Sequence, residues 1–406
     1  MPFHSIDEMR EAAERRVPKP VFDFVAGGAG HDTGVAENVA AFDRIRLIPR
    51  ALVDITEIDL SRELFGRRWA MPFGFAPVGY ANIIWPGADE ALARAAAAAN
   101  IPYSLSTAGS TSIERIGEVA PKNAWFQLYI MKDNRFNDDL LARADASGFE
   151  VLLVTVDVPQ NARRLRNMRN GFGLPLRYST ALAFDLVRRP AWCLATARAG
   201  IPRLGNMVKY APKGSSAMQT VEFFPRHSCG PMDWSVLKRI RGLWKKKLVV
   251  KGLVSVDDAL LAQDIGADGV LISNHGGREL EGTIATFDAL PAIRAAVGPD
   301  FPLLIDSGVR TGEHILKALA AGATFVLVGR CAMFGVGAMG AAGAQRVIEI
   351  LRDEMRDVAA HLGVTAMSQL SPAFLRYPPG SGYSGLASRV YGMRSTFEEQ
   401  MPGVST

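Results

Sequence analysis

The sequence of 406 residues predicts an α/β protein built on a (β/α)8 TIM barrel, with an N-terminal helical extension and a long insertion after strand 4. Three observations predict this fold. Helical segments rich in Ala and Leu alternate with short apolar runs, as in 259–276 and 315–330. Eight such runs occur, each too short for a helix and apolar throughout, as strands buried in a parallel sheet are. Polar groups follow nearly every run at its C-terminal end, where barrel enzymes form their active sites.

The elements follow in order along the chain. Residues 1–70 precede the barrel, and we expect them to add helices and a cover. The eight strands are expected at 71–79, 102–108, 125–130, 151–159, 248–252, 269–276, 302–308 and 325–330. Six of the seven gaps have room for one helix, whereas the fourth contains the insertion, at 171–240. We therefore predict a single domain over 1–375, and from 376 to 406 a tail rich in Pro, Gly and Ser that extends over the surface.

The composition excludes several classes of protein. Hydrophobic residues make up 48% and charged residues 21% of the chain, which excludes a disordered chain, a collagen and a coiled coil. The three cysteines include no CxxC pair, so neither a disulfide scaffold nor a metal site is expected. The first 16 residues contain no apolar signal core, which predicts a cytoplasmic protein.

The charge is concentrated in one stretch. The formal net charge is +5, but from 161 to 251 there are 19 Lys and Arg and only three acids, a net +16, which leaves −11 for the remainder. Within this stretch, 178–215 mixes arginines with apolar side chains, namely Leu182, Phe184, Leu186, Trp192 and Leu194. Such a basic amphipathic segment suits the surface of an anionic membrane. The alternative is an ordinary insertion over the active site, with its cations in water or against an acidic neighbouring subunit. No nucleic-acid partner is expected, because no recognised binding module accompanies the charge.

Two patterns imitate other kinds of site. A GxGxxG occurs at Gly335, Gly337 and Gly340, but a dinucleotide fingerprint needs a strand directly before it and an acid that ends a βαβ unit. We interpret these glycines as a place where helices pack closely. The apolar segment 322–344 resembles a membrane span, but Arg330 in its middle and its strand-like first half indicate a buried part of the barrel.

Two motifs at the predicted barrel mouth indicate chemistry. SNHGGR places His275 and Arg278 three residues apart, and a neutral base beside a permanent cation suits proton abstraction next to a bound anion. A lone histidine is more often a surface or core residue, and turn glycines need no ligand. Two arginines stand beside such glycines after strands 7 and 8, however, where barrel enzymes commonly bind phosphate. The residues concerned are Gly308, Arg310, Gly329 and Arg330.

Together the motifs FQLY, TVD-P, VKG, SNHGGR, D-GVR and VGR resemble the FMN-dependent L-2-hydroxy acid oxidases and dehydrogenases, over about residues 5–375. The segments RRPAWCLATARAGIPRLGNMV, DWSVLKRIRGLW and QLSPAFL are most similar to the mandelate-oxidising members. The resemblance implies FMN as cofactor, a mandelate-like aryl 2-hydroxy acid as substrate and a homo-oligomer, with a tetramer favoured. It also implies that electrons pass to a membrane quinone and that 178–215 attaches the protein peripherally to the inner face of the cytoplasmic membrane.

The resemblance also implies a role for individual residues. His275 would be the base that faces the substrate α-carbon, Asp157 would stabilise its protonated form, and Tyr129 would hydrogen-bond the substrate hydroxyl. It leaves open whether the α-hydrogen departs as a proton or as a hydride. Arg278 and Arg164 would bind the substrate carboxylate.

The flavin contacts follow in the same way. Lys251 would lie near the N1 edge of the flavin, where a fixed cation stabilises negative charge on the reduced ring. The other residues implied to contact the cofactor are Pro77, Val78, Gly79, Ser106, Gln127, Thr155, Ser273 and Asp306, with Gly308, Arg310, Gly329 and Arg330 at its phosphate.

The sequence departs from the family pattern at the substrate end. Phe24 occupies the position where many relatives have a tyrosine that binds the substrate carboxylate, and the lost hydrogen bond is typically worth ~1–1.5 kcal/mol or more. Leu165 and Asn167 stand where acids are common. These changes leave the reacting set intact, so they bear on the substrate.

Two alternatives remain beside the quinone-linked dehydrogenase. One is a soluble oxidase of the same family that uses O2 and produces H2O2, acting on a different or modified acid; Gly79, whose counterpart in oxidases is often Ala, favours the dehydrogenase. The other is a barrel that binds a phosphate ligand without redox activity. The combination of His275, Asp157 and Lys251 disfavours it.

Overall fold

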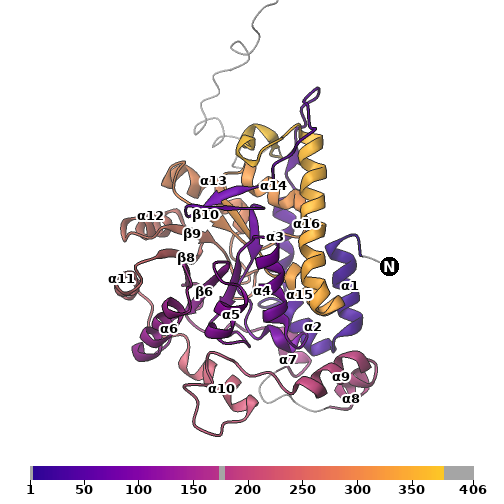
Figure 1. Cartoon of the computed structure of the whole chain (residues 1–406), viewed down its shortest axis with the longest axis vertical. Helices are drawn as coiled ribbons and strands as arrows, with labels where there is room; N and C mark the ends of the chain where they lie inside the picture. Colours follow the sequence, from indigo (N-terminus) through magenta and orange to yellow (C-terminus); the bar gives the residue numbers. More distant parts are fainter. Residues whose placement is uncertain (1–2, 173–178, 379–406) are drawn as a thin grey trace, which may run out of the picture.

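The computed structural model describes residues 3–172 and 179–378, and its centre is a closed barrel of eight parallel strands (Figure 1). The strands are β4 (Phe73–Phe75), β5 (Tyr103–Ser106), β6 (Ala124–Tyr129), β7 (Val151–Thr155), β8 (Lys247–Leu253), β9 (Gly269–Ile272), β10 (Leu303–Ile305) and β11 (Phe325–Val328). They are hydrogen-bonded in chain order, and β11 closes the barrel against β4. Each strand overlaps one predicted run, so the predicted fold class is confirmed.

Helices connect the strands and form the outer layer. They are α4 (Ala88–Ala98), α5 (Ile113–Val119), α6 (Asn134–Ala146), α11 (Trp234–Leu243), α12 (Val256–Asp264), α13 (Thr286–Val297), α14 (Gly312–Ala320) and, after the last strand, α15 (Arg330–Met339) and α16 (Ala341–Leu362). Polar side chains determine where several of them begin, because the side chains of Ser112, Asp133 and Thr311 accept hydrogen bonds from the first backbone N–H groups of α5, α6 and α14.

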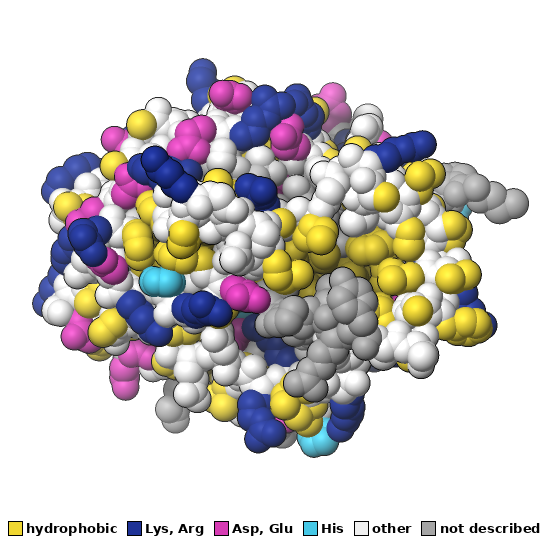
Figure 2. Space-filling model, turned by 90° about the horizontal axis from the view of Figure 1, so that it is seen from below, with side chains coloured by type: hydrophobic (Ala, Val, Ile, Leu, Met, Phe, Trp, Pro, Cys, Tyr) yellow, Lys and Arg dark blue, Asp and Glu magenta, His cyan; other side chains and the backbone are white. Residues whose placement is uncertain are grey.

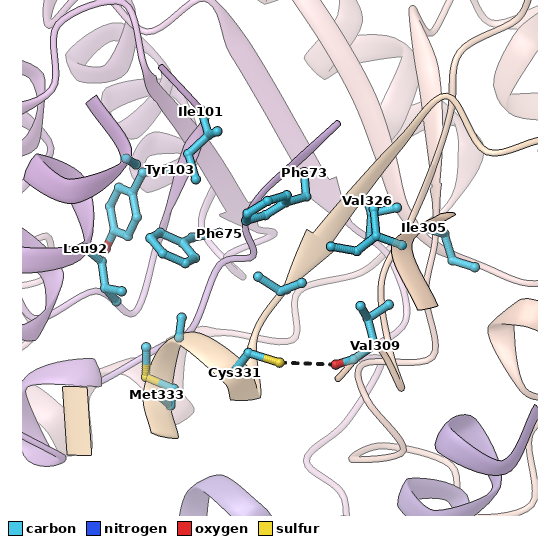
Figure 3. Packing of buried hydrophobic residues seen from close by; sticks show 14 of the residues in the cluster. Phe73, Phe75, Leu92, Ile101, Tyr103, Ile305, Val309, Val326, Cys331 and Met333 are labelled. Carbon is cyan, nitrogen blue, oxygen red and sulfur yellow. Dashed lines mark hydrogen bonds between the residues drawn. The ribbon is translucent and has the colours of Figure 1, made fainter. Parts of the chain in front are cut away.

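Apolar side chains fill two layers. Inside the barrel, Trp125 lies with Leu153, Leu271 and Phe325, and the ring of Trp69 covers it at 6.0 Å between centroids. Trp69 belongs to the hairpin of β2 (Arg62–Leu64) and β3 (Arg67–Trp69), which thereby covers the N-terminal end of the barrel. The second layer lies between strands and helices. Figure 3 shows part of it, including the Cys331 thiol, which donates to the carbonyl of Val309.

The N-terminal extension lies against the barrel with three helices. These are α1 (Ile6–Arg16), α2 (Lys19–Ala26) and α3 (Thr33–Asp43). β1 (Arg46–Leu47) then pairs with β12 (Leu375–Arg376), so the segment that follows α3 contacts the C-terminal end of the described chain. Of the predicted tail at 376–406, residues 379–406 lie outside the described residues. Short 3-10 helices complete the fold at Ala81–Ile83 (η1), Met367–Gln369 (η2) and Pro372–Phe374 (η3).

The GxGxxG segment is a close contact between helices, as predicted. A Cβ added to Gly335 in α15 would lie 2.6 Å from the carbonyl oxygen of Gly343 in α16 and 2.4 Å from Val347 Cγ2. A Cβ on Gly337 would lie 2.9 Å from Ala13 Cβ in α1. Within the described residues, no helix is long and apolar enough to cross a membrane, and 322–344 is divided between β11, α15 and the start of α16.

The insertion lies over the end of the barrel where the strands terminate, at the bottom of Figure 1. Its helices include α8 (Thr180–Val187), α9 (Pro190–Ala199) and α10 (Ala217–His227), and residues 173–178 lie outside the described part. The short helix α7 (Leu165–Arg169) directly precedes it. The Trp192 indole N–H donates to the carbonyls of Ile83 and Ile84, at 3.2 and 3.1 Å. The backbone N–H of Lys19 donates to Asp185 Oδ2 at 2.6 Å. The pair of helices α8 and α9 is therefore fixed to η1 and α2.

Candidate active site

A cavity of about 590 Å³ opens at the C-terminal ends of the barrel strands. This volume is in the range of sites for cofactors and small substrates, about 300–1,000 Å³. Most of the site residues predicted from the sequence line it, namely Phe24, Pro77, Val78, Gly79, Tyr129, Arg164, Lys251, His275, Arg278, Asp306, Gly308, Arg310, Gly329 and Arg330. The other five, Ser106, Gln127, Thr155, Asp157 and Ser273, lie behind this lining, and four of them are almost completely buried.

A tyrosine, a histidine and an aspartate form one hydrogen-bonded line of side chains. The Tyr129 hydroxyl lies 3.0 Å from His275 Nε2, and His275 Nδ1 lies 3.1 Å from Asp157 Oδ1. His275 has a φ of +58°, a left-handed conformation that is unusual for histidine, and Gly276 and Gly277 continue the same turn at +72°. The strained turn aims the imidazole back at the strand ends, as strained backbone at functional sites commonly does.

The charges around this line fix its protonation. Burial opposes the ionisation of Asp157, but its electrostatic interactions with His275 and Lys251 outweigh burial and lower the pKa of the carboxyl. Burial raises the pKa of Tyr129 well above its usual value, and the charge of Asp157 adds to the effect. At neutral pH Asp157 is therefore a carboxylate and Tyr129 a neutral donor. Because Nδ1 faces the carboxylate, it bears the ring proton, and Nε2 is the nitrogen available as a base.

Lys251 supplies a fixed positive charge in the cavity wall. Its Nζ donates to Ser273 Oγ at 2.7 Å and lies 3.5 Å from Asp306 Oδ2. Burial alone would lower the pKa of this ammonium, but the charges of Asp306 and Asp157 outweigh burial and raise it. Lys251 therefore stays charged although its side chain is only 4% exposed.

Three polar side chains behind the cavity bond to one another. Ser106 Oγ donates to Gln127 Oε1 at 2.8 Å, and Gln127 Nε2 donates to Thr155 Oγ1 at 2.7 Å. All three are fully enclosed. The structure thus brings these residues together one layer behind the cavity lining, and their contact with a cofactor stays a prediction.

The cavity lining contains more positively charged side chains than negatively charged ones. Arg330 donates to the carbonyls of Val25, Gly27 and Gly276, and burial and the neighbouring Arg310 lower its pKa to about 9. Burial likewise lowers the pKa of Arg278, and the charges of Arg164 and Arg330 lower it further. Buried cations in this arrangement are stabilised by bound anions. The cavity is therefore suited to a ligand with a phosphate and to a second anionic group.

The two glycines at the predicted phosphate end, Gly308 and Gly329, have different surroundings. A Cβ on Gly308, at φ +91°, would lie 2.1 Å from the Asn38 carbonyl oxygen, so this glycine is required by the contact with α3. Gly329 has no such neighbour, since a Cβ there would meet only Ala76 and Val78 beyond 3.6 Å. Gly329 directly precedes α15, whose N-terminal N–H groups favour an anion.

Sequence reasoning missed several residues of the cavity wall. Glu279 Oε1 accepts from Arg164 Nη2 at 2.6 Å, so Arg164 already has a partner. Phe172 stacks on Phe24 with 4.9 Å between ring centroids, and Phe224 of α10 lies 5.6 Å from the Tyr129 ring. The position of Glu279, next to Arg278 in the predicted motif, was an available signal. Phe224 gave none, because the sequence does not show which face of α10 turns toward the barrel.

A closed barrel with a base, a fixed cation and an anion-binding end at its strand C-termini defines a barrel enzyme that uses a phosphate-bearing cofactor. A model of the FMN-dependent dehydrogenase family matches residues 13–377. The chain belongs to this family, and it is an FMN-dependent enzyme of the 2-hydroxy acid dehydrogenases and oxidases.

Individual relatives are similar over nearly the whole chain. (S)-Mandelate dehydrogenase of Pseudomonas putida is 37% identical, covering 92% of this chain and 93% of its own. An L-lactate dehydrogenase of Caulobacter vibrioides and the 4-hydroxymandelate oxidase of Amycolatopsis orientalis are each 38% identical, covering 91% and 89% of this chain and 97% and 95% of their own. The crystal structure described as monotopic membrane protein (S)-mandelate dehydrogenase superposes with a TM-score of 0.90 at 36% identity, over 93% of this chain and 100% of that one.

The described residues provide the groups that FMN requires. The guanidinium groups of Arg310 and Arg330, which have no ion pair with a carboxylate among the described residues, suit its phosphate, as does the open backbone at Gly329. Lys251 suits the electron-rich edge of its ring. When bound, FMN accepts the two electrons that a substrate loses.

Proposed function

We propose that this enzyme oxidises an L-2-hydroxy acid with an aryl side chain to the 2-oxo acid. The observation that supports it is the line of Tyr129, His275 and Asp157, which opens into a cavity with aromatic walls. Phe24, Phe172 and Phe224 line the same cavity, Phe224 against the Tyr129 ring, and aromatic walls of this kind suit a phenyl ring.

Each group has a defined task in this proposal. His275 Nε2 takes a proton from the substrate, and the Asp157 carboxylate stabilises the imidazolium that results. Tyr129 keeps its proton and donates to the substrate oxygen. Arg278 attracts the acid group, with Arg164 beside it.

We further propose that the electrons leave through a membrane quinone, with α8 and α9 at the lipid surface. Phe184, Val187, Leu194 and Ile201 are 60%, 78%, 52% and 58% exposed, which is unusual for large apolar side chains that lie close together in the chain. Arg188 lies 4.2 Å over the Phe184 ring, so a cation is available for anionic lipid. Figure 2 shows hydrophobic side chains gathered on this face of the molecule around a hollow. The description of the similar (S)-mandelate dehydrogenase as a monotopic membrane protein supports the same attachment.

The structure changes which side chains belong to this surface. Trp192, expected among the apolar residues of the amphipathic segment, is buried and bonded to η1. Leu204 and Met207 are buried as well, so a deletion of 178–215 would remove part of the cover of the barrel. Attachment is therefore better tested by point substitutions in α8 and α9.

The second candidate is an oxidase that passes its electrons to O2 and forms H2O2. The similarity to 4-hydroxymandelate oxidase at 38% identity supports it as much as the comparison with mandelate dehydrogenase supports a dehydrogenase.

One experiment tests the reaction and separates the acceptors. The FMN-loaded protein is mixed anaerobically with L-mandelate, L-lactate or glycolate, and bleaching of the flavin absorbance is followed. We expect L-mandelate to bleach it fastest; no bleaching by any 2-hydroxy acid would contradict the proposal. The reduced protein is then exposed to O2 or to a short-chain quinone. Rapid reoxidation by quinone with little peroxide supports the dehydrogenase, and stoichiometric peroxide supports the oxidase.

A further inference from the structure

His314 is a buried histidine beside the predicted phosphate end of the cavity, and the proposed reaction gives it no task. It lies in the first turn of α14, four positions after Arg310. The backbone N–H of Arg310 donates to His314 Nδ1 at 3.3 Å, and His314 Nε2 lies 3.1 Å from Asp43 Oδ1 at the end of α3. A nitrogen that accepts from an N–H has no proton of its own, so the ring proton is on Nε2 and points to Asp43.

The loop between β10 and α14 is attached to α3 at two points, one on each side of Arg310. At the first, Gly308 lies against the carbonyl of Asn38. At the second, the ring of Phe42 stacks on that of His314, with 4.9 Å between centroids and 9° between planes. The guanidinium of Arg310 lines the cavity, so its position depends on how these two attachments hold the loop.

The surroundings of His314 favour the uncharged ring. Burial lowers the pKa of His314 and Lys317 lowers it further, whereas Asp43 and Glu313 raise it without outweighing burial. Glu354 on α16 also lies at this turn, where it accepts from the first backbone N–H of α14 at 2.6 Å. At neutral pH the ring is therefore uncharged, and its Nδ1 is available as an acceptor.

We propose that His314 is a positioning residue for the FMN phosphate, because its uncharged ring holds the backbone of Arg310 and thereby directs the guanidinium toward the phosphate. Protonation of Nδ1 removes the acceptor and sets an N–H against the N–H of Arg310. The loop then loses one of its two attachments to α3, and FMN binds more weakly. This inference goes beyond the proposed function, because it concerns the cofactor and not the substrate. It rests on the placement of the phosphate at Arg310.

The test compares the binding of FMN with that of riboflavin, which lacks the phosphate. Protein loaded with either flavin is diluted in steps between pH 8 and pH 5.5, and the rise in flavin fluorescence on release gives the dissociation constant. The variant His314→Asn places a carboxamide oxygen near the position of Nδ1 and does not titrate, whereas His314→Leu has no acceptor. The matched control is His361→Leu, because His361 on α16 is exposed and lies outside the cavity lining.

At pH 8 we expect His314→Leu to bind FMN about five- to tenfold more weakly, the size of one hydrogen bond, with riboflavin little changed. His314→Asn and His361→Leu should bind FMN as the wild type does. Toward pH 5.5 the wild type should lose affinity for FMN about threefold or more relative to His314→Asn, because only the wild type has a ring at this position that protonates. The phosphate titrates at about pH 6 in every variant, so its effect cancels in this ratio.

A wild type that follows His314→Asn at every pH overturns the proposal. So does a loss in His314→Leu that is equal for FMN and riboflavin, because a merely structural defect weakens both. If His314→Leu does not fold, the comparison of the wild type with His314→Asn decides. Arg310→Met is measured in parallel, and normal binding of FMN by this variant would show that the placement of the phosphate is wrong and would overturn the proposal for that separate reason.

Discussion

At the scale of single residues, the reaction depends on a histidine held in a conformation that few side chains adopt. Asparagine tolerates the left-handed backbone of His275, at φ +58°, so His275→Asn removes the base without forcing the turn to change. We expect the rate of flavin reduction by substrate to fall by about 10²–10⁴-fold, the usual contribution of a general base. Anaerobic stopped-flow absorbance measures it, with the FMN content of the purified variant as control. A variant with FMN bound and a near-normal rate would show that another group is the base.

Asp157 gives a prediction about pH. Its pKa is lowered in the folded protein because its electrostatic interactions with His275 and Lys251 outweigh burial. A carboxyl with a lowered folded pKa stabilises the fold above its unfolded pKa, about 4, and this stabilisation disappears as pH falls through the folded value. Asp157→Asn should therefore lower the free energy of unfolding by about 1.5–3 kcal/mol at pH 7. The difference from wild type should shrink below about pH 4. Urea titrations at pH 7, 5 and 3.5 measure it, and a difference that grows toward acid would contradict the assigned shift.

Arg310 tests where the phosphate of FMN binds. Arg310→Met removes a cavity cation, and a lost charge-assisted contact of about 1.5–3 kcal/mol weakens binding about 10- to 150-fold. Riboflavin lacks the phosphate and is the matched control ligand. Quenching of flavin fluorescence should show weaker binding of FMN with riboflavin little changed. Equal losses for both ligands would place the phosphate elsewhere.

The residue scale also shows how far the sequence predicts the site. His275 and Arg278 are neighbours in one motif, so their meeting at a strand end could be predicted from chain order and barrel geometry alone. The ion pair of Glu279 with Arg164 joins residues 115 positions apart, and it forms only because the fold brings Arg164, the residue before α7, to the turn after β9. The need for glycine at position 308 likewise arises from the distant Asn38.

At the scale of elements, strands were predictable because each is a continuous apolar run buried on both sides. The helices of the insertion were not, because the sequence does not determine which of their apolar side chains pack inward. Trp192 and Phe184 look alike in the sequence, yet Trp192 is buried against η1 and Phe184 faces outward. The contact of α15 with α16 was predictable in kind, since closely spaced glycines outside a strand–turn–helix context indicate helix packing.

The contact between α15 and α16 can be tested with two glycine-to-alanine substitutions, one in the contact and one in α11, for which we expect opposite changes in the free energy of unfolding. Gly335→Ala places a methyl group 2.4 Å from Val347 Cγ2 and 2.6 Å from a backbone oxygen, so we expect a loss of about 1–3 kcal/mol in the free energy of unfolding. Gly242 lies inside α11, and an added Cβ there has no neighbour within 4 Å. Gly242→Ala should therefore stabilise by about 0.5–1 kcal/mol, because alanine loses less backbone entropy in a helix. Thermal and urea unfolding measure both, and a neutral Gly335→Ala would contradict the close contact.

At the scale of the whole molecule, α8 and α9 lie on the face that also contains the cavity, and there they expose apolar side chains (Figures 1 and 2). Attachment through this face would bring the reduced flavin close to a lipid-soluble acceptor. The helices are anchored to η1 and α2 by hydrogen bonds, so their outward apolar side chains are presented by a fixed scaffold.

Membrane attachment is testable with a triple variant and a matched control. Each apolar side chain that enters lipid contributes about 1.5–3 kcal/mol, so Phe184→Glu, Val187→Glu and Leu194→Glu together should weaken vesicle binding by more than about 100-fold. The control introduces the same three charges at exposed apolar positions elsewhere, Leu52, Ile55 and Leu261. Co-sedimentation with phosphatidylglycerol–phosphatidylcholine vesicles measures binding, and unchanged bleaching of the flavin by substrate confirms an intact site. The wild type and the control should sediment with the vesicles and lose binding as salt rises, because the arginines contribute through anionic lipid. Sedimentation of the α8–α9 variant equal to that of the control would exclude this surface as the attachment site and favour an acceptor in solution.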